Sequence, residues 1–321
     1  MHLERGEDLS RILPSLVTVI LCCTYLLPNI GSGPLWPLVV THHSNLCKKY
    51  MWRNMLLIHN YFGFEKMCLT HTHQVGIDMQ LFLITPIFAY LLWHRRKVGL
   101  WFLGVVALLS TVLRFWVTWD NSLSHVVHYG IPISRMFKTA SLSYILPTHR
   151  ATIYLIGVLL SYVLRYSRKT VFSTLQLCAI WSILYPITLS AWLGPVHMSV
   201  KGYQYNKLQA ALYAALSPIF WGTGIAWVIY AVNRGFGSWF GPLLKWKYFV
   251  FFTKISYAVY LIQFPVFFYN VGKTRHVDEY KPYMMLQVIE TGLIVLLAII
   301  LTLTVELPFQ NIKKVLFAQG K

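Results

Sequence analysis

Two acidic residues inside otherwise apolar runs are the first candidates for chemistry. Asp78 lies in the segment QVGIDMQLF with Gln80 two positions further on, and Glu290 lies near the start of the last apolar run. An ionisable group within a membrane span is costly and often marks a ligand or proton pathway. The structural alternatives are a carboxylate at Asp78 that caps its helix, and a pairing of Glu290 with Lys254, a tyrosine or a tryptophan of a neighbouring helix.

Histidines are frequent in the segments between the apolar runs: His42, His43, His71, His73, His125 and His128. A neutral imidazole can accept the proton of a hydroxyl group, and the pair His71-x-His73 has a spacing that can bind metal. No third ligand follows at a suitable distance. Nucleotide-binding loops, the Gly-x-Ser-x-Gly elbow and the His-Glu-x-x-His motif are absent. We therefore expect no metal site and no bound cofactor.

The composition points to a bilayer environment. Of the 321 residues, 56% are apolar and only 12% are charged, about half the charged share of a soluble domain. The formal net charge is +18, but the basic residues form short clusters between apolar runs, not a stripe. Such clusters orient membrane proteins and meet anionic headgroups. The expected partner is the lipid bilayer, and nucleic acid is not expected.

Eight apolar segments are long enough, or nearly so, to cross the roughly 30 Å hydrocarbon layer as helices. They lack the strict alternation of barrel strands, so helices are the expected form. The eight expected spans are Ile12–Leu27, Gln74–Trp93, Val98–Trp119, Ala151–Leu164, Val171–Leu193, Leu208–Val232, Tyr248–Tyr269 and Met284–Leu307.

The density of basic residues predicts the orientation. With the N-terminus inside, the short inner connections carry Arg95 to Lys97 and similar clusters, which favours both termini in the cytoplasm. Acidic residues near the N-terminus argue against a cleaved signal peptide. The expected fold is an all-α polytopic membrane helix bundle of about eight helices. We expect one domain over residues 1–321, with residues 28–73 as an extracytoplasmic loop, in the secretory pathway or plasma membrane.

The five cysteines divide between spans and loop. Cys22, Cys23 and Cys178 lie in expected spans, where they are most simply apolar thiols. Cys47 and Cys68 both lie in the expected outer loop, which is an oxidising space. They are the candidates for a disulfide, and two free thiols are the alternative.

Several segments together resemble the acyltransferase-3 family, in particular its animal "nose resistant to fluoxetine" branch. Their order and spacing run along almost the whole chain. The segments are LPNIGSGPLW (Leu27–Trp36), the Trp52–Asn60 stretch between Cys47 and Cys68, DMQLF (Asp78–Phe82), YLIGVLLSYVL (Tyr154–Leu164), ISYAVYLIQFPV (Ile255–Val266) and VELPFQNI (Val305–Ile312).

The resemblance implies a membrane enzyme that transfers an acyl group, typically acetyl, from acyl-CoA to a hydroxyl of a lipid or carbohydrate acceptor. Aligning SRILP with the family's Arg-x-x-Arg loop puts Arg11 on the second arginine and Asp8 in place of the first. Arg11 would then hold a CoA phosphate, and Asp78 and Gln80 would shape the acceptor pocket. Gln263 stands where relatives often carry histidine.

The resemblance also implies a missing part. The family's essential histidine and its Ser-Gly motif lie on helices that the alignment places before Met1, so the domain is expected to be N-terminally incomplete, with no intact catalytic residue. We therefore expect the chain to be inactive alone. One alternative is a non-catalytic lipid or small-amphiphile binder or transporter, with Asp78 and Glu290 as pathway residues. A truncated copy without independent function is the other.

Overall fold

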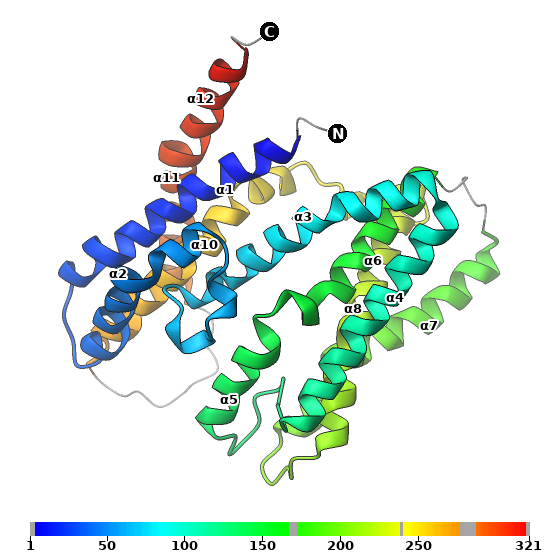
Figure 1. The fold of residues 1–321 in the computed structure, drawn as a ribbon, viewed down its shortest axis with the longest axis horizontal. Coiled ribbons are helices and arrows are strands. Elements are labelled where there is room, and N and C mark those ends of the chain that lie inside the picture. Colours follow the sequence, from blue (N-terminus) through cyan, green and yellow to red (C-terminus); the bar gives the residue numbers. More distant parts are fainter. Residues whose placement is uncertain (1–3, 167–171, 238–239, 276–286, 319–321) are drawn as a thin grey trace. The chain divides into compact units, whose positions relative to one another are not determined.

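The computed structural model describes all residues except 1–3, 167–171, 238–239, 276–286 and 319–321 (Figure 1). Every regular element of the described residues is helical, as expected. The α-helices are α1 (Glu4–Leu21), α2 (His42–Met55), α3 (His73–His94), α4 (Arg96–Asp120), α5 (Ile133–Thr139), α6 (Pro147–Tyr166), α7 (Thr174–Leu193), α8 (Lys207–Arg234), α9 (Phe240–Leu244), α10 (Phe249–Lys273), α11 (Val288–Leu301) and α12 (Leu307–Ala318).

Seven helical segments of the described residues are long and apolar enough to cross a membrane. They correspond to all the expected spans but the fourth, so the chain is an integral, multi-pass membrane protein. The seven segments are Ile12–Asn29, Thr70–His94, Arg96–Asp120, Thr174–Ser199, Lys207–Arg234, Phe249–Lys273 and Val288–Ile312. The orientation of the termini stays a prediction.

The fourth expected span lies in α6, a 20-residue helix with polar residues at both ends. Its first turn meets α4, where the carbonyl of His149 accepts a hydrogen bond from Arg114. At its last turn, the carbonyls of Val163 and Leu164 accept hydrogen bonds from Arg234 at the end of α8. Because α6 runs alongside these two long helices from end to end, its contacts are those of a further pass. That α6 crosses the membrane stays a prediction.

Local sequence signals explain where two of the long helices begin and end. The hydroxyl of Ser173 accepts from the backbone of Gln176, whose side chain in turn accepts from the backbone of Ser173, and this capping box starts α7. The side chain of Asn206 caps the first turn of α8. Gly235 follows the last residue of α8 with φ of 90°, a left-handed conformation that glycine adopts without strain.

Four π-helical turns interrupt or extend the α-helices. They carry wider backbone turns than an α-helix, and such turns often occur at functional positions. The π turns are Cys22–Leu26 after α1, Pro37–Thr41 before α2, Ala140–Tyr144 after α5, and Thr302–Glu306 between α11 and α12.

The chain forms two compact units, which are described separately. Unit 1 consists of residues 1–62, 66–73 and 246–321, and so contains α1, α2, α10, α11 and α12 (Figure 1). Its interior includes the buried side chains of Leu16, Ile20, Val40 and Leu261. Helix α2 and several short helical turns occupy the segment that the sequence analysis describes only as a loop, residues 28–73.

Unit 2 consists of residues 63–65 and 74–245. Helices α4, α6 and α8 pack against one another, and α7 packs against α8 (Figure 1). Phe88 and Leu92 of α3, Leu103 of α4 and Leu155 of α6 form one buried apolar cluster. A single domain over residues 1–321 stays a prediction.

Candidate functional site

A cavity of about 350 Å³ lies within unit 2 among α4, α6, α7 and α8. The C-terminal halves of α4 and α7 and the N-terminal halves of α6 and α8 line it, so the four helices alternate in direction around it. The lining residues are Arg114, His149, Arg150, Ile153, Ala191, Trp192, Tyr213, Ser217, Pro218 and Trp221. Two arginines and no carboxylate line this cavity among the described residues.

Arg114 lies on α4, within a segment apolar enough to span the membrane. Its Nη1 donates to the carbonyl oxygen of His149 at 3.3 Å. Its Nε is buried and has no hydrogen-bond partner in the part of the chain that the structure describes. The guanidinium therefore keeps donor capacity for a ligand.

His149 lies in the first turn of α6 and is only 5% exposed. Its Nδ1 is 3.1 Å from the hydroxyl of Thr148. Its Nε2 is buried, and no described residue offers it a hydrogen-bond partner. Because a buried polar atom normally finds a partner, this nitrogen is a second group poised for a ligand in the cavity.

Arg150 follows directly and is held by neutral groups. Its Nε donates to the carbonyl oxygen of Tyr144 at 3.2 Å, and its guanidinium lies 4.3 Å from the centre of the Tyr144 ring. Its Nη1 donates to the side-chain oxygen of Gln74 at 3.2 Å. These contacts fix the orientation of the cation without cancelling its charge.

His125 adds a fourth basic residue near the cavity. Its Nε2 lies 2.9 Å from the hydroxyl of Ser143. Burial, together with the positive charges of Arg114 and Arg150, lowers the pKa of His125 to about 3. The ring is therefore neutral at physiological pH, and its depressed pKa reflects the positive potential around the two arginines.

Asp78, the sharpest candidate of the sequence analysis, does not line the cavity. It lies in the second turn of α3 with an exposed side chain, and its Oδ1 accepts from Nε2 of Gln74 at 2.9 Å. Gln74 in turn accepts from Arg150, so Asp78 contacts the cavity wall through one amide. Its observed contact is with a side chain four residues earlier and not with the start of the helix. Gln80 is partly buried on the same helix.

The two other predicted site residues belong to unit 1. Glu290 lies in the first turn of α11, where its Oε2 accepts from Nδ2 of Asn270 on α10 at 2.9 Å. That contact ties two neighbouring helices together. Arg11 lies in α1, and its side chain lies outside the described part of the chain. The structure therefore groups none of the predicted residues except Asp78 and Gln80, which share α3.

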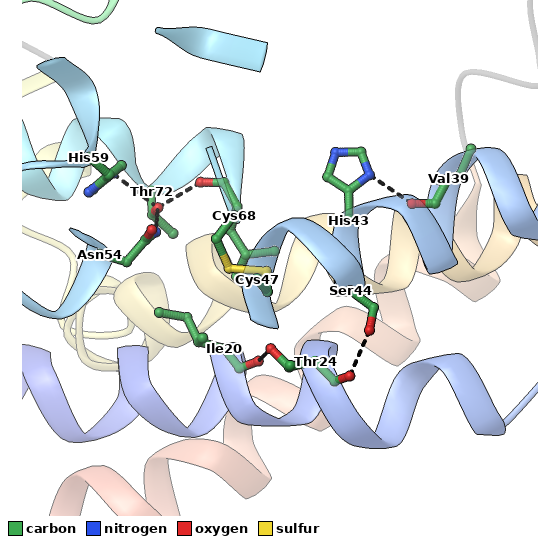
Figure 2. Close-up of a disulfide and its surroundings, with 11 residues drawn as sticks. Ile20, Thr24, Val39, His43, Ser44, Cys47, Asn54, His59, Cys68 and Thr72 are labelled. Atoms are coloured by element: carbon green, nitrogen blue, oxygen red, sulfur yellow. Dashed lines mark hydrogen bonds between the residues drawn. A yellow bond between two sulfur atoms is a disulfide. The ribbon is translucent and has the colours of Figure 1, made fainter. Parts of the chain in front are cut away.

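Cys47 and Cys68 are joined by a disulfide that connects α2 to the segment before α3 (Figure 2). Beside it, the hydroxyl of Thr72 donates to the carbonyl oxygen of Leu69 at 2.7 Å and accepts from Nδ2 of Asn54 at 2.9 Å. The Nε2 of His59 lies 3.3 Å from the same hydroxyl. Since that hydroxyl has only one proton to donate, His59 is the donor in this contact.

Histidines of unit 1 do not assemble into a metal centre. Burial lowers the pKa of His59 to about 4, and the neighbouring His73 contributes in the same direction. Among the described residues, no group of three or more His, Cys, Asp and Glu side chains is arranged to hold a metal ion.

Sequence reasoning missed the cavity. It treated Arg114 as a side chain that reaches for the membrane surface, and it did not single out His149 or Arg150. The signal was present in the sequence: Arg114 stands alone in a long apolar run, and His149-Arg150 comes immediately before another. What the sequence did not show is that the beginning of α6 lies beside the end of α4.

The fold and the cavity define a multi-pass helical membrane protein with a cationic site between its helices. Residues 8–309 match the model of the acyltransferase-3 family, described as an acyltransferase domain. The chain belongs to this family. It is 23% identical to nose resistant to fluoxetine protein 6 of Caenorhabditis elegans, over 97% of this chain and 39% of that protein. The chain thus spans about two fifths of the length of this curated relative. No solved structure matches.

Proposed function

We propose that this chain takes part in the transfer of an acyl group from acyl-CoA to a hydroxyl of a lipid or carbohydrate acceptor at the membrane. In this reaction the acceptor oxygen forms a bond to the acyl carbon, the carbon–sulfur bond breaks, and CoA leaves as its thiol with the hydroxyl proton. Membership of the acyltransferase-3 family supports the reaction class. The observation that carries the proposal is the cavity with Arg114, His149 and Arg150 in its wall.

The cavity is the proposed acceptor site. In the orientation predicted from the basic loops, the end of α4 and the beginning of α6 lie on the non-cytoplasmic side, whereas Arg11 lies near the cytoplasmic side. Arg11 would hold a phosphate of CoA, and the chain of contacts from Asp78 through Gln74 to Arg150 would position the wall of the acceptor site. The contact of Glu290 with Asn270 supports a structural role for that residue.

We expect these 321 residues to bind both ligands and, by themselves, not to transfer the acyl group. The resemblance assigns the acid–base step to a histidine outside the matched segments, and losing a general base costs about two to four orders of magnitude. His149 is a neutral hydrogen-bond donor or acceptor in the cavity, but nothing holds it in an acid–base pair with a carboxylate.

Binding of labelled acetyl-CoA to the purified chain in lipid nanodiscs tests the proposal. We expect binding that free CoA competes and that Arg11→Ala weakens, with Lys97→Ala, an exposed basic residue of the next predicted cytoplasmic connection, as the control. Absence of binding at millimolar acetyl-CoA would reject the proposal. Transfer of label to lipid in the same samples would confirm the acyltransferase and contradict inactivity of the chain alone.

A second function has one specific observation in its favour. Trp192 and Trp221 line the cavity and are 70% and 44% exposed, which suits a membrane amphiphile whose apolar part leaves the cavity between two rings. The chain would then bind or carry such a molecule without chemistry. Uptake of labelled lipid into vesicles that contain the protein tests this function, and uptake unchanged when Asp78→Asn and Glu290→Gln are combined would reject a role for these two acids.

A further inference from the structure

We propose that the cavity of unit 2 binds the anionic group, a phosphate or a carboxylate, of an amphiphile whose apolar part lies against Trp192 and Trp221. The inference deepens the proposed function, since it assigns the acyl acceptor to the class of anionic amphiphiles. Binding itself requires only the cavity, so it can be tested without any acyl transfer.

Charge balance is the first argument. Arg114 and Arg150 both line the cavity, and their printed hydrogen bonds go to the neutral oxygens of His149, Tyr144 and Gln74. A buried cation without a counter-ion is costly in a protein interior and more so within a membrane. Asp78 attracts Arg150 from beyond Gln74, but it does not line the cavity. A ligand anion would supply the missing negative charge.

Unused donors are the second argument. The Nε of Arg114 and the Nε2 of His149 are buried without hydrogen-bond partners among the described residues. Both belong to residues that line the same cavity. An oxyanion offers several acceptor lone pairs in a small volume, so one phosphate or carboxylate could accept from both groups. Charge-assisted hydrogen bonds of this kind are about twice as strong as neutral ones.

The beginning of α6 is the third argument. His149 and Arg150 lie in the first turn of this 20-residue helix, where backbone N–H groups lack partners within the helix and the helix dipole is positive. The side chains and the helix dipole therefore favour the same sign of charge at the same place.

The remaining wall sets the rest of the ligand. Ile153, Ala191 and Pro218 give an apolar surface, and the hydroxyl of Tyr213 is fixed by its donation to the carbonyl of Ala191 at 3.0 Å. The volume of about 350 Å³ is at the lower end of small-molecule sites. It would hold a headgroup and the first part of a chain, while the longer apolar part lies outside.

The test measures binding of labelled dioctanoyl phosphatidic acid to the protein in phosphatidylcholine nanodiscs. We expect Arg114→Gln and Arg150→Gln each to weaken binding about tenfold. The matched control is Arg165→Gln, an exposed arginine at the other end of α6, which should leave affinity unchanged. Higher salt should weaken binding to the native chain more than to the two cavity variants.

Three competitors distinguish the source of the anion. Competition by octanoate as well as by unlabelled dioctanoyl phosphatidic acid would show that a carboxylate suffices, and competition by inorganic phosphate alone would show that a free phosphate suffices. Both results support the inference. Equal competition by the neutral dioctanoylglycerol, with no effect of either arginine variant, would overturn it.

A second pair of measurements guards against a mere folding defect. Thermal unfolding of each variant is recorded in the same nanodiscs, and Trp221→Leu is expected to weaken the amphiphile while leaving competition by inorganic phosphate unchanged. Arg114→Lys, which keeps the charge but loses the forked geometry, should restore part of the affinity. Amphiphile binding without acetyl-CoA binding would uphold this inference and reject the proposed function, and the reverse result would do the opposite.

Discussion

The guanidinium of Arg150 on α6 donates to the side-chain oxygen of Gln74 on α3 at 3.2 Å. The amide nitrogen of Gln74 then donates to Asp78 at 2.9 Å. One amide thus separates the acid that the sequence singled out from the cation that lines the cavity. This spacing makes Asp78 a residue that positions the cavity wall and tempers the charge of Arg150.

The first prediction concerns Asp78. Replacing it with asparagine removes a negative charge near Arg150 but keeps an oxygen that can accept from Gln74. We therefore expect Asp78→Asn to leave the affinity for an anionic amphiphile unchanged or to raise it by about threefold, measured by the nanodisc titration. A tenfold loss would show instead that the carboxylate itself contacts the ligand.

The second prediction concerns the disulfide. Cys47 and Cys68 are 21 positions apart, and closing a loop of that length stabilises the folded state by about 3 kcal/mol in the chain-entropy model. We expect Cys47→Ser to lower the unfolding temperature in detergent and reductant to lower that of the native chain similarly. The same reductant should leave Cys47→Ser unaffected, and an effect on that variant would contradict this explanation.

The third prediction concerns pH. The pKa of His59 in the folded chain, about 4, lies below the ordinary value of 6.5, so the unfolded state takes up the proton more readily. The stability contributed by a neutral His59 is complete above pH 6.5 and is lost progressively as the pH falls towards 4. We expect the unfolding temperature to fall between pH 7 and pH 5.

A variant isolates the share of His59 in that fall. His59→Asn should lower the unfolding temperature at pH 7 and flatten its decrease towards pH 5, while the buried His125, whose pKa is about 3, keeps its own contribution. An equally steep decrease in the variant would assign the pH effect to other groups.

The fourth prediction concerns packing between α7 and α8. A Cβ at Gly224 would overlap the side chain of Thr188, so the two helices approach closely through a glycine, as is common in membranes. Gly224→Ala should destabilise the protein by about 1–3 kcal/mol, and adding Thr188→Ala should recover part of the loss. Gly104→Ala, where a Cβ meets nothing within 4 Å, should be neutral in the same thermal assay.

The sequence predicted the helical membrane fold well, because apolar runs of this length have few other solutions. It placed the start of the first span, Ile12, where the structure has it. It did not predict α2, whose composition is polar and whose helical form depends on packing within unit 1. The tie from Cys47 to Cys68 holds this helix in place.

The candidate site was harder to predict because it depends on which helix ends meet. Asp78 stood out as an isolated acid, yet its neighbour Gln74 makes the contact with Arg150. Arg114 and His149 are 35 positions apart and touch only because α4 and α6 pack side by side. No periodicity in either segment specifies that pairing.

The π turn at Thr302–Glu306 makes the end of the chain sensitive to length more than to composition. Glu306 closes this turn and is 1% exposed, in a buried position set by the wider turn. Deleting one residue there would restore α-helical winding and rotate everything that follows by about 100°. Glu306 and the apolar face of α12 would then point in new directions, so an insertion or deletion at this point acts as a rotation of the last helix.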